Sequence, residues 1–160
     1  MFLRPAEPHD FPAVWSILRP IIRAGETLAL DRDMSEADAL ASWCKPEHEV
    51  FVAELDGQVV GTYYIRSNQA GGGRHVCNCG YAVKPAATGR GVARAMCAHS
   101  FDHARRRGER AMQFNFVVST NTRAVALWES FGFRTIGRLP GAFNHPALGY
   151  VDALVMFRDL

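Results

Sequence analysis

The sequence predicts one α/β domain built on a mixed sheet of about seven strands with about four helices. Three features carry this prediction. Asp56-Gly57 stands between two β-rich segments, which is a strong hairpin signal. A strand-like run that ends at Val83 leads through a glycine-rich turn into a long helix. Strand and helix patterns then alternate toward the C-terminus without an internal repeat, as expected when helices cover a sheet.

The N-terminal part is predicted to contain a strand and a helix. Residues 1–4 read as a short strand, and Asp10 can cap the helix that follows. Apolar residues recur at helical spacing along this helix: Phe11, Val14, Trp15, Leu18, Ile21 and Ile22. Pro20 should kink the helix or end it early, because proline lacks the N–H that a helix interior needs. A polar loop is expected over residues 23–27.

A second short helix and a hairpin follow. Ser35-Glu36-Ala37-Asp38 resembles a capping box and opens a helix that should stop before Pro46. Residues 50–55 and 59–65 are rich in β-formers and are joined by Asp56-Gly57. They are therefore predicted to be the two strands of a β-hairpin.

The second half of the chain alternates between strands and helices. We expect a flexible glycine-rich loop over residues 68–74 and strands over 75–83, 111–118 and 133–139. Helices are expected between these strands, over residues 90–107 and 122–131. The last strand, over residues 150–158, should come after a loop that contains Phe143-Asn144-His145-Pro146. This order describes strands that pair in one mixed sheet.

Composition limits the class of protein. The chain has 160 residues, of which 48% are hydrophobic and 21% are charged, so a single domain over 1–160 can bury a sizeable core. A formal net charge of +2 is too small to argue for nucleic acid or a membrane surface as a partner. No apolar run approaches the roughly 18 residues of a membrane-spanning helix, and the N-terminus lacks a signal-peptide pattern.

The four cysteines, Cys44, Cys77, Cys79 and Cys97, lie within apolar runs. Cys77 and Cys79 would share one face of a strand, which is the wrong spacing for a zinc knuckle, and no histidine cluster accompanies them. We therefore expect reduced core residues rather than a metal site. Reduced cysteines favour a cytoplasmic protein.

The stretch from Val83 to Ala93 is the centre of the functional argument. Pro85 ends the strand, and Gly89 and Gly91 leave the backbone N–H groups free to converge at the start of a helix. The helix N-terminus adds partial positive charge there, so the turn suits a phosphate or pyrophosphate. A plain turn that begins a helix is the alternative.

The glycine spacing restricts the ligand further. A Walker loop needs four residues between its glycines, followed by Lys and Ser or Thr, and these are absent. A dinucleotide fingerprint needs a third glycine at the position of Arg94.

Two motifs resemble the GNAT N-acetyltransferase family. Thr88-Gly89-Arg90-Gly91-Val92-Ala93 is similar to its pyrophosphate loop, Gln/Arg-x-x-Gly-x-Gly/Ala, with Thr88 in the first position. The stretch from Asn121 to Phe133 matches the later family motif, Asn-x-x-Ala-x-x-Leu-Tyr-x-x-x-Gly-Phe, except at Trp128. The pattern spans about residues 49 to 157. It implies the GNAT fold, with a mostly antiparallel sheet, and acetyl-CoA as co-substrate.

The resemblance also implies the residues that bind acetyl-CoA. The strand residues Tyr81, Ala82 and Val83 would lie along the pantetheine arm, with the backbone of Tyr81 and Val83 pairing with it like an added strand. The pyrophosphate would be held by the amides of Thr88, Gly89, Arg90, Gly91, Val92 and Ala93, with Arg94 nearby. Asn121 would cap the helix that begins at residue 122 and would also contact the cofactor. The alternative is that Asn121 only caps this helix. Trp128 occupies the position at which the family commonly has a tyrosine that acts as the acid for the leaving thiolate.

Two asparagines interrupt apolar strands at Asn78 and Asn115. Alternation predicts one strand face with Met112, Phe114, Phe116 and Val118, and the opposite face with Gln113, Asn115 and Val117. Asparagine is depleted in strands and costly to bury without a partner, so both need an explanation. They are either satisfied structural amides or, by the resemblance, groups that hold the acceptor amine and the thioester carbonyl where the two strands separate.

The surroundings of the asparagines are also similar to those in fungal azetidine-2-carboxylate acetyltransferases, a subfamily that uses two asparagines. This implies a small-molecule amine as substrate, an amino or imino acid or an analogue. Acceptor selection would lie with Glu26, Thr27, Tyr64 and the loop near His145.

The family reaction is direct attack of a neutral amine on the thioester in a ternary complex. Trp128 is too weak an acid to protonate the leaving thiolate, which leaves water or another group such as Tyr81 for this role. Two other functions stay open: a protein N-terminal acetyltransferase and an acyl-CoA-binding module without turnover. The resemblance further implies a homodimer formed through the last strands.

Overall fold

The computed structural model describes residues 1–160 and contains one seven-stranded sheet in the order β1-β2-β3-β4-β5-β7-β6. The strands are β1 (Phe2–Pro5), β2 (Glu49–Leu55), β3 (Gln58–Ser67), β4 (Val76–Val83), β5 (Ala111–Val118), β6 (Arg134–His145) and β7 (Gly149–Asp159). The helices are α1 (Phe11–Ala24), α2 (Glu36–Trp43), α3 (Val92–Arg106) and α4 (Thr122–Ser130). Every neighbouring pair of strands is antiparallel except β4 and β5. The predicted mixed, mostly antiparallel sheet is confirmed.

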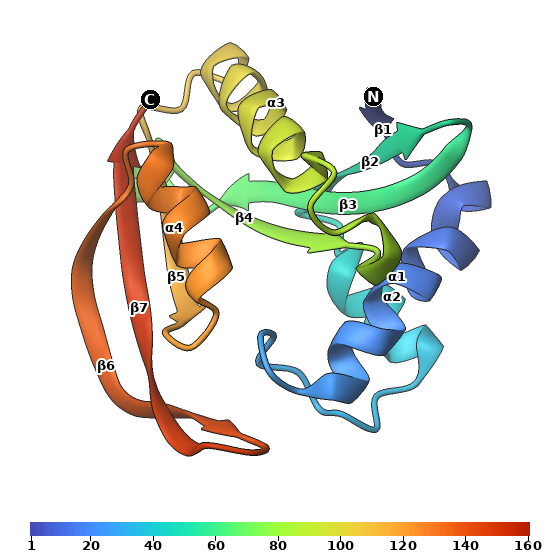
Figure 1. The fold of residues 1–160 in the computed structure, drawn as a ribbon. Helices are drawn as coiled ribbons and strands as arrows, with labels where there is room; N and C mark the ends of the chain where they lie inside the picture. Colours follow the sequence, from blue (N-terminus) through green and yellow to red (C-terminus); the bar gives the residue numbers. More distant parts are fainter.

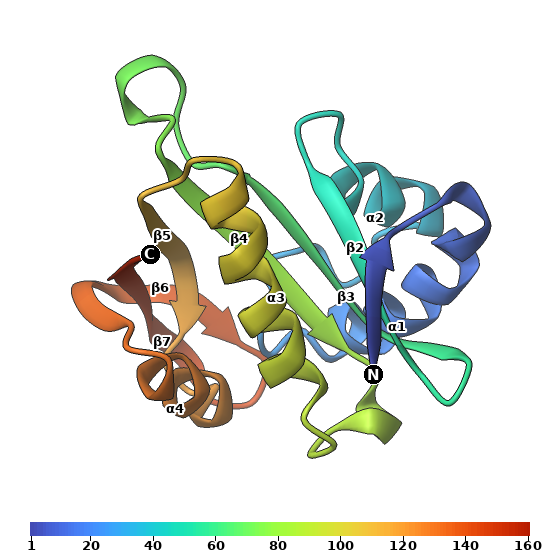
Figure 2. The same cartoon turned by 90° about the horizontal axis from the view of Figure 1, so that it is seen from above.

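The helices cover both faces of the sheet. Figures 1 and 2 show α3 across one face and α1 with α2 on the other. The alternating side chains of β2, β3 and β4 explain this division. On β3, Tyr63 and Ile65 are buried in the cluster that includes Met96 of α3, whereas on β2 Val52 is buried with Ile17 of α1. Two apolar cores on opposite faces therefore hold the layers together.

Strands β4 and β5 separate soon after they begin to pair. Their parallel register joins Val76 to Ala111 and Cys77 to Met112, and it stops there. In Figure 1 the two strands diverge toward the lower part of the molecule, with β5, β6 and β7 on one side of the gap and α1 and α2 on the other. The sheet is thus opened between β4 and β5, its fourth and fifth strands, and this opening positions the candidate site.

The structure of α1 differs from two expectations, the Asp10 cap and an early end of the helix at Pro20. The side chain of Asp10 does not cap the helix, because its carboxylate accepts from Arg4 at 2.6 and 2.8 Å and from the Glu7 N–H at 2.8 Å. These bonds, Arg4 foremost, lower the pKa of Asp10 to about 2. Pro20 lies inside the helix, which continues to Ala24. Ile22, which follows the proline, is buried in the core, and this burial of apolar surface favours the helical turn from Pro20 to Ala24.

The predicted alternation along β5 fails after Asn115. The register with β7 shifts between Phe114 and Val117, so a bulge inserts an extra residue. As a result Val117 is buried in the core together with Phe114, whereas Phe116 is 37% exposed. The extended β6 is a second difference: residues 143–145 belong to the strand, and the expected loop is reduced to the short turn before Gly149.

Local signals in the first half predicted their structures correctly. Asp56 and Gly57 both have positive φ, 54° and 75°, as a type I′ hairpin turn requires. The Ser35 hydroxyl accepts from the Asp38 N–H at 3.1 Å and caps α2. All four cysteines are free, and three of them are buried. None of the helices combines the length and the apolar character needed to cross a bilayer.

Candidate active site

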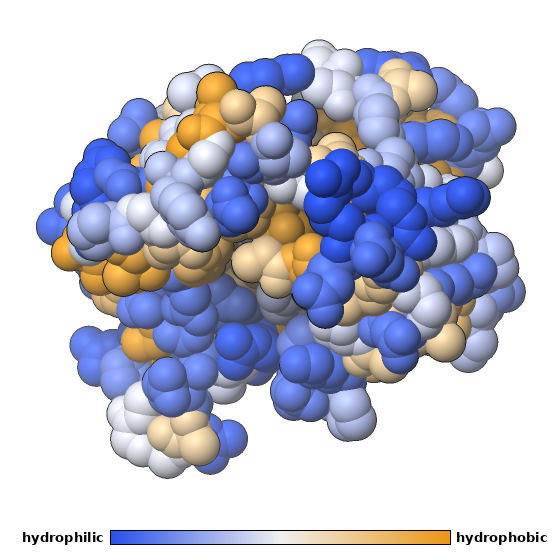
Figure 3. Space-filling view, turned by 90° about the horizontal axis from the view of Figure 1, so that it is seen from below, coloured by the Kyte–Doolittle hydropathy of each residue, from blue (hydrophilic) through white to orange (hydrophobic).

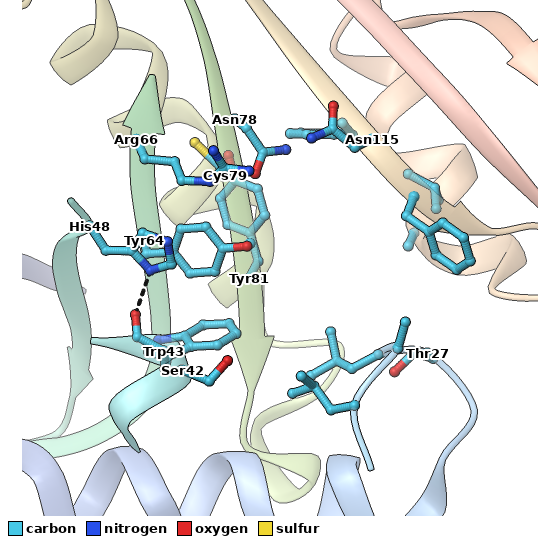
Figure 4. A pocket seen from close by; sticks show the side chains of 18 of the residues that line it. Thr27, Ser42, Trp43, His48, Tyr64, Arg66, Asn78, Cys79, Tyr81 and Asn115 are labelled. Atoms are coloured by element: carbon cyan, nitrogen blue, oxygen red, sulfur yellow. Dashed lines mark hydrogen bonds between the residues drawn. The ribbon is translucent and has the colours of Figure 1, made fainter. Parts of the chain in front are cut away.

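A cavity of about 550 Å³ occupies the opening between β4 and β5. It is bounded by the loop after α1, the end of α2, the cavity face of β3 and β4, and β5 with the start of α4. Figure 3, which views the molecule from below, shows a central hollow with apolar residues at its floor and hydrophilic residues around it. Figure 4 shows that side chains from these elements converge on one space.

Two cross-strand pairs form the wall of the cavity on β3 and β4. Tyr64 lies opposite Gly80, and Arg66 lies opposite Asn78. Residues directly opposite each other project to the same face, so all four line the cavity. Gly80 makes this possible, because a Cβ there would stand 2.4 Å from Cε1 of Tyr64. The tyrosine ring therefore lies across β4 and its hydroxyl points into the open space (Figure 4).

An aromatic cluster fixes Tyr64 in this orientation. The Trp43 ring meets it edge-on at 4.9 Å between centroids, and the His48 ring stacks on it at 4.1 Å. The Trp43 indole N–H donates to the Thr62 hydroxyl at 3.2 Å. Burial raises the pKa of Tyr64 above its ordinary value. The acceptor side of the cavity is thus a rigid apolar wall with a neutral phenol at its edge.

His48 is held in one protonation state by its contacts. Its Nδ1 lies 2.8 Å from the Trp43 carbonyl, and because a carbonyl oxygen only accepts, Nδ1 carries the proton. Nε2 then keeps its lone pair. Burial lowers the pKa of His48, and Arg66 and Lys45 lower it further. The imidazole is therefore neutral at pH 7 and able to accept a proton.

The lowered pKa of His48 predicts a loss of stability in mild acid. Below a pH of about 6.5 the unfolded chain binds a proton at this histidine, whereas the folded protein binds it only at lower pH. The free energy of unfolding should therefore fall as the pH decreases from about 6.5 through the folded pKa of His48. Urea unfolding at several pH values measures this fall. His48→Gln should show a shallower dependence on pH than the parent protein, and parallel curves would contradict the assignment.

The structure brings the two asparagines together in this cavity. Asn78 is 6% exposed, and its Nδ2 donates to the Gln113 carbonyl at 2.9 Å, across the point where the β4–β5 ladder ends. Asn115 donates from Nδ2 to the Asn68 side chain at 2.7 Å and accepts from the Gln113 side chain at 3.0 Å. Both amides are structurally bonded, and both line the cavity. Asn78 Oδ1 has no hydrogen-bond partner in the protein and is the acceptor left for a ligand.

The edge of β4 that faces the gap offers unpaired backbone groups. At the ends of the β3–β4 ladder, the Lys84 N–H donates to the Val60 carbonyl and the Asn68 N–H donates to the Val76 carbonyl, each at 2.8 Å. Bonded pairs alternate along an antiparallel ladder, so Tyr81 and Val83 direct their N–H and C=O groups away from β3. They face β5, whose pairing with β4 has already ended. Ala82 bonds to β3 and is buried, so its backbone does not reach this edge.

The turn after β4 has the geometry of an anion site. Gly89 and Gly91 have φ of 83° and 80°, and nothing lies within 4 Å of a Cβ built on either. No backbone carbonyl accepts from the N–H groups of Gly89, Gly91, Val92, Ala93 or Arg94. These free donors stand at the N-terminus of the 15-residue α3, where the helix dipole adds positive charge. The residues present therefore fit a pyrophosphate.

The two arginines of this turn are held by neighbouring elements. Arg90 pairs with Asp56 of the β2–β3 turn at 3.2 Å. Arg94 donates to the Ser130 hydroxyl at 3.1 Å, and its guanidinium stands 5.0 Å from the centre of the Phe131 ring. Both side chains are exposed and remain close to the turn. Thr88, the first residue of the motif, is also exposed and bonds to the Pro85 carbonyl through its N–H.

Three predicted residues lie at the α4 end of the cavity. Asn121 caps α4, with Oδ1 accepting from the Ala124 N–H at 3.4 Å, and it also lines the cavity. Trp128 is buried and packs 5.0 Å from Tyr81. The Tyr81 hydroxyl is bonded to the Ser100 hydroxyl at 2.8 Å on the α3 side of the sheet, and burial raises its pKa well above the ordinary value. Tyr81 is therefore not placed as the acid for a leaving thiolate.

The predicted acceptor residues divide into two groups. Tyr64 and Thr27 line the cavity, whereas Glu26 is exposed and outside its lining. His145 lies near the tip of the β6–β7 hairpin, where its Nδ1 accepts from two backbone N–H groups of the turn, and it does not line the cavity. His145 lies outside the cavity because β6 is longer than expected and extends to this residue, which holds it at the end of the hairpin.

Sequence reasoning did not find Trp43, His48 and Arg66, which line the acceptor side. A signal for Arg66 was present, because it follows Tyr64 by two residues on one strand and must share its face. Trp43 and His48 flank the connection between α2 and β2. Nothing in their local pattern places them against β3.

Comparisons with known proteins agree with this geometry. The model of the acetyltransferase (GNAT) family matches residues 11–133. N-acetyltransferase aca1 of Schizosaccharomyces pombe is 29% identical over 156 residues, which cover 84% of the chain and 72% of that relative.

Two solved structures extend the comparison. A GCN5-related N-acetyltransferase from Kribbella flavida is 45% identical, with a TM-score of 0.93 over 99% of this chain and 97% of that one. The acetyltransferase yncA from Salmonella typhimurium, solved with acetyl-CoA and described as putative, is 25% identical, with a TM-score of 0.85 over 100% and 94% of the two chains.

Proposed function

The chain belongs to the acetyltransferase (GNAT) family and is an acetyltransferase that uses acetyl-CoA, and from this premise we propose that its acceptor is the amine of a small amino or imino acid. One observation carries the proposal. The opening between β4 and β5 leads into a cavity of about 550 Å³, in which Asn78 and Asn115 meet a wall of aromatic side chains. A cavity of this volume suits a small acceptor beside the end of a thioester arm.

The residues for acetyl-CoA lie along one path. The pyrophosphate would be held by the free N–H groups of Gly89, Gly91, Val92, Ala93 and Arg94, because the N–H of Arg90 already donates to the Ala87 carbonyl. The unpaired edge of Tyr81 and Val83 would pair with the pantetheine arm. This path runs from the start of α3 along β4 toward Asn78. Asn121 and Trp128 would border the arm on the α4 side.

Acetyl-CoA supplies an acetyl thioester, whose carbonyl carbon forms a bond to the amine nitrogen while the bond to sulfur breaks and CoA thiolate leaves. We propose that Asn78 Oδ1 accepts an N–H of the neutral amine and so orients its lone pair. The amine also loses a proton, and neutral His48 is the cavity group whose protonation state allows it to take one. Trp128 cannot donate a proton, so water would protonate the thiolate.

The experiment that tests this function follows CoA release across a panel of amines. Amino acids, cyclic imino acids, polyamines and short peptides would each be offered with acetyl-CoA. Turnover should be greatest with an amino or imino acid. Preference for a peptide would favour N-terminal acetylation of proteins. Tight binding of acetyl-CoA without release of CoA by any amine would favour an acyl-CoA-binding module instead.

We further propose that two copies pair through the last strands in the cytoplasm. Strand β6 is an unpaired edge of the sheet, and Ile136 on it is 57% exposed. On the neighbouring β7, Tyr150 is 78% exposed. Light scattering during size exclusion should give twice the mass of 17.7 kDa, and the monomer mass would overturn the pairing. The four free cysteines, three of them buried, suit a reducing compartment.

A further inference from the structure

Arg66 is a half-buried cation that lines the cavity without a carboxylate partner. No Asp or Glu oxygen lies within 4.0 Å of its guanidinium, although eight other side chains of Arg or His form such pairs elsewhere in the molecule. Its own contacts are long ones, at 3.2 Å to the Ser67 carbonyl and 3.4 Å to the Asn68 carbonyl. Guanidinium has five N–H donors in a planar fork, so most of its capacity is left for a ligand.

The register of β3 and β4 places this cation beside the reacting nitrogen. Arg66 is the cross-strand partner of Asn78, and such pairs have Cα atoms roughly 5.5 Å apart when they exchange backbone bonds. Both side chains project into the cavity, and Tyr64 projects from the same face two residues away (Figure 4). A ligand whose nitrogen contacts Asn78 therefore has its next atoms within reach of the guanidinium.

The charges around the cavity favour an anion at this point. Besides Arg66, the charged side chains of the lining are Lys45 and Glu47, and both are exposed at its rim. A neighbouring polar cavity along the β3–β4 loop is lined by Arg66 and Arg74 and contains no acidic residue. Burial is the main cause of the lowered pKa of His48, and the positive charge of Arg66 lowers it further. A carboxylate in the cavity would meet the unneutralised cation of Arg66, with the exposed Glu47 at the rim as the only acid of the lining.

We propose that Arg66 binds the carboxylate of the acceptor, so that the enzyme selects amines with a carboxylate on the adjacent carbon. This proposal rests on the proposed function and specifies its substrate class. Two N–H groups of the guanidinium donate to the two carboxylate oxygens, and the Tyr64 hydroxyl, which lines the same cavity, donates to the same group. Recognition of the carboxylate fixes the neighbouring nitrogen against Asn78.

Matched pairs of acceptors test the proposal. L-Proline would be compared with pyrrolidine and with L-proline methyl ester, and L-azetidine-2-carboxylate with azetidine, by CoA release and by calorimetric binding in the presence of CoA. In the parent protein the carboxylates should have a KM at least about 10-fold below that of their partners without a free carboxylate. Arg66→Ala should raise KM for the carboxylates by about 10- to 100-fold and leave the amines without a carboxylate within about threefold.

Arg74→Ala is the matched control, because it removes the same charge from the neighbouring cavity without touching the main one. It should leave all acceptors within about threefold. Arg66→Lys, which keeps the charge and loses the planar fork, should fall between the parent protein and Arg66→Ala. Equal loss for carboxylates and for amines without a carboxylate in Arg66→Ala, or equal effects of Arg66→Ala and Arg74→Ala, would overturn the proposal.

Failure of the proposed function gives a different result. If no amine releases CoA, the acetyl-transfer proposal fails, and calorimetry still decides on Arg66. Binding of the carboxylates, weakened by Arg66→Ala, would then support the subsite without turnover. Absence of binding by every carboxylate would overturn it. Turnover of the amines without a carboxylate at least equal to that of the carboxylates would overturn the carboxylate preference while the acetyltransferase stands.

Discussion

Asn78→Ala should lower kcat/KM for the preferred acceptor by about 10²- to 10³-fold, the loss typical of removing one oriented polar group from a reacting centre. The side chain supplies the acceptor oxygen that has no partner in the protein, and its Nδ2 joins β4 to β5 at the point where the strands part. Its loss removes both the contact to the amine and the brace beneath it. Acetyl-CoA affinity should change by less than about threefold, because the pyrophosphate turn is elsewhere on the chain.

Two further variants test whether the loss is specific to Asn78 among the bonded amides of the site. Gln113→Ala removes the side-chain bond to Asn115 but keeps the carbonyl to which Asn78 donates, so its activity should stay within about fivefold of the parent. Asn115→Ala should cost about 10-fold, since both polar atoms of Asn115 already bond to neighbours and orient the site indirectly. Steady-state kinetics and thermal melting would be measured on all three. Equal losses of activity in Asn78→Ala and Gln113→Ala would contradict a specific role of Asn78 at the reacting centre.

Gly91→Val should weaken acetyl-CoA binding by about 100-fold, because its side chain would occupy the space from which a pyrophosphate approaches the free N–H groups. The residue is the N-cap of α3, with φ of 80°. The substitution therefore also introduces backbone strain of about 1–3 kcal/mol. Isothermal titration with acetyl-CoA measures the affinity, and chemical unfolding measures the strain.

Gly57→Val is the control for strain. Gly57 has a similar φ of 75°, and nothing lies within 4 Å of a Cβ built on it, but it belongs to the β2–β3 hairpin turn. Both variants should lose similar stability, whereas only Gly91→Val should lose affinity for acetyl-CoA. If the two variants bind acetyl-CoA equally well, the turn at 88–93 is an ordinary start of a helix.

The order of the strands and helices followed from local signals. Asp56-Gly57 specifies a turn by its own backbone preferences, and Ser35 caps α2 through an adjacent N–H. The glycines before α3 also adopt the positive φ that their residue type favours. These features depend on residues close in the sequence, which is why the pattern alone identified them.

Several predictions failed because contacts between distant residues prevailed. Asp10 could cap a helix by its position, but Arg4 on β1 takes its carboxylate. The apolar pattern of β5 predicted strict alternation, but the register with β7 requires a bulge that buries Val117 and exposes Phe116. The hydroxyl of Tyr81 points toward Ser100 of α3 rather than toward the gap. Local pattern carries no information about these partners.

By itself, the sequence determined the family and the glycine-rich turn before α3, and it singled out the two asparagines, because each of these depends on the spacing of neighbouring residues. Only the tertiary structure decided that Asn78 faces Arg66 across two strands and that Gly80 leaves room for the Tyr64 ring. It also brought Trp43 and His48 against that ring. The physical reason is that the register between strands and the packing of a helix on a sheet are set by the whole core, so the chemistry of the acceptor pocket emerges only when distant segments meet.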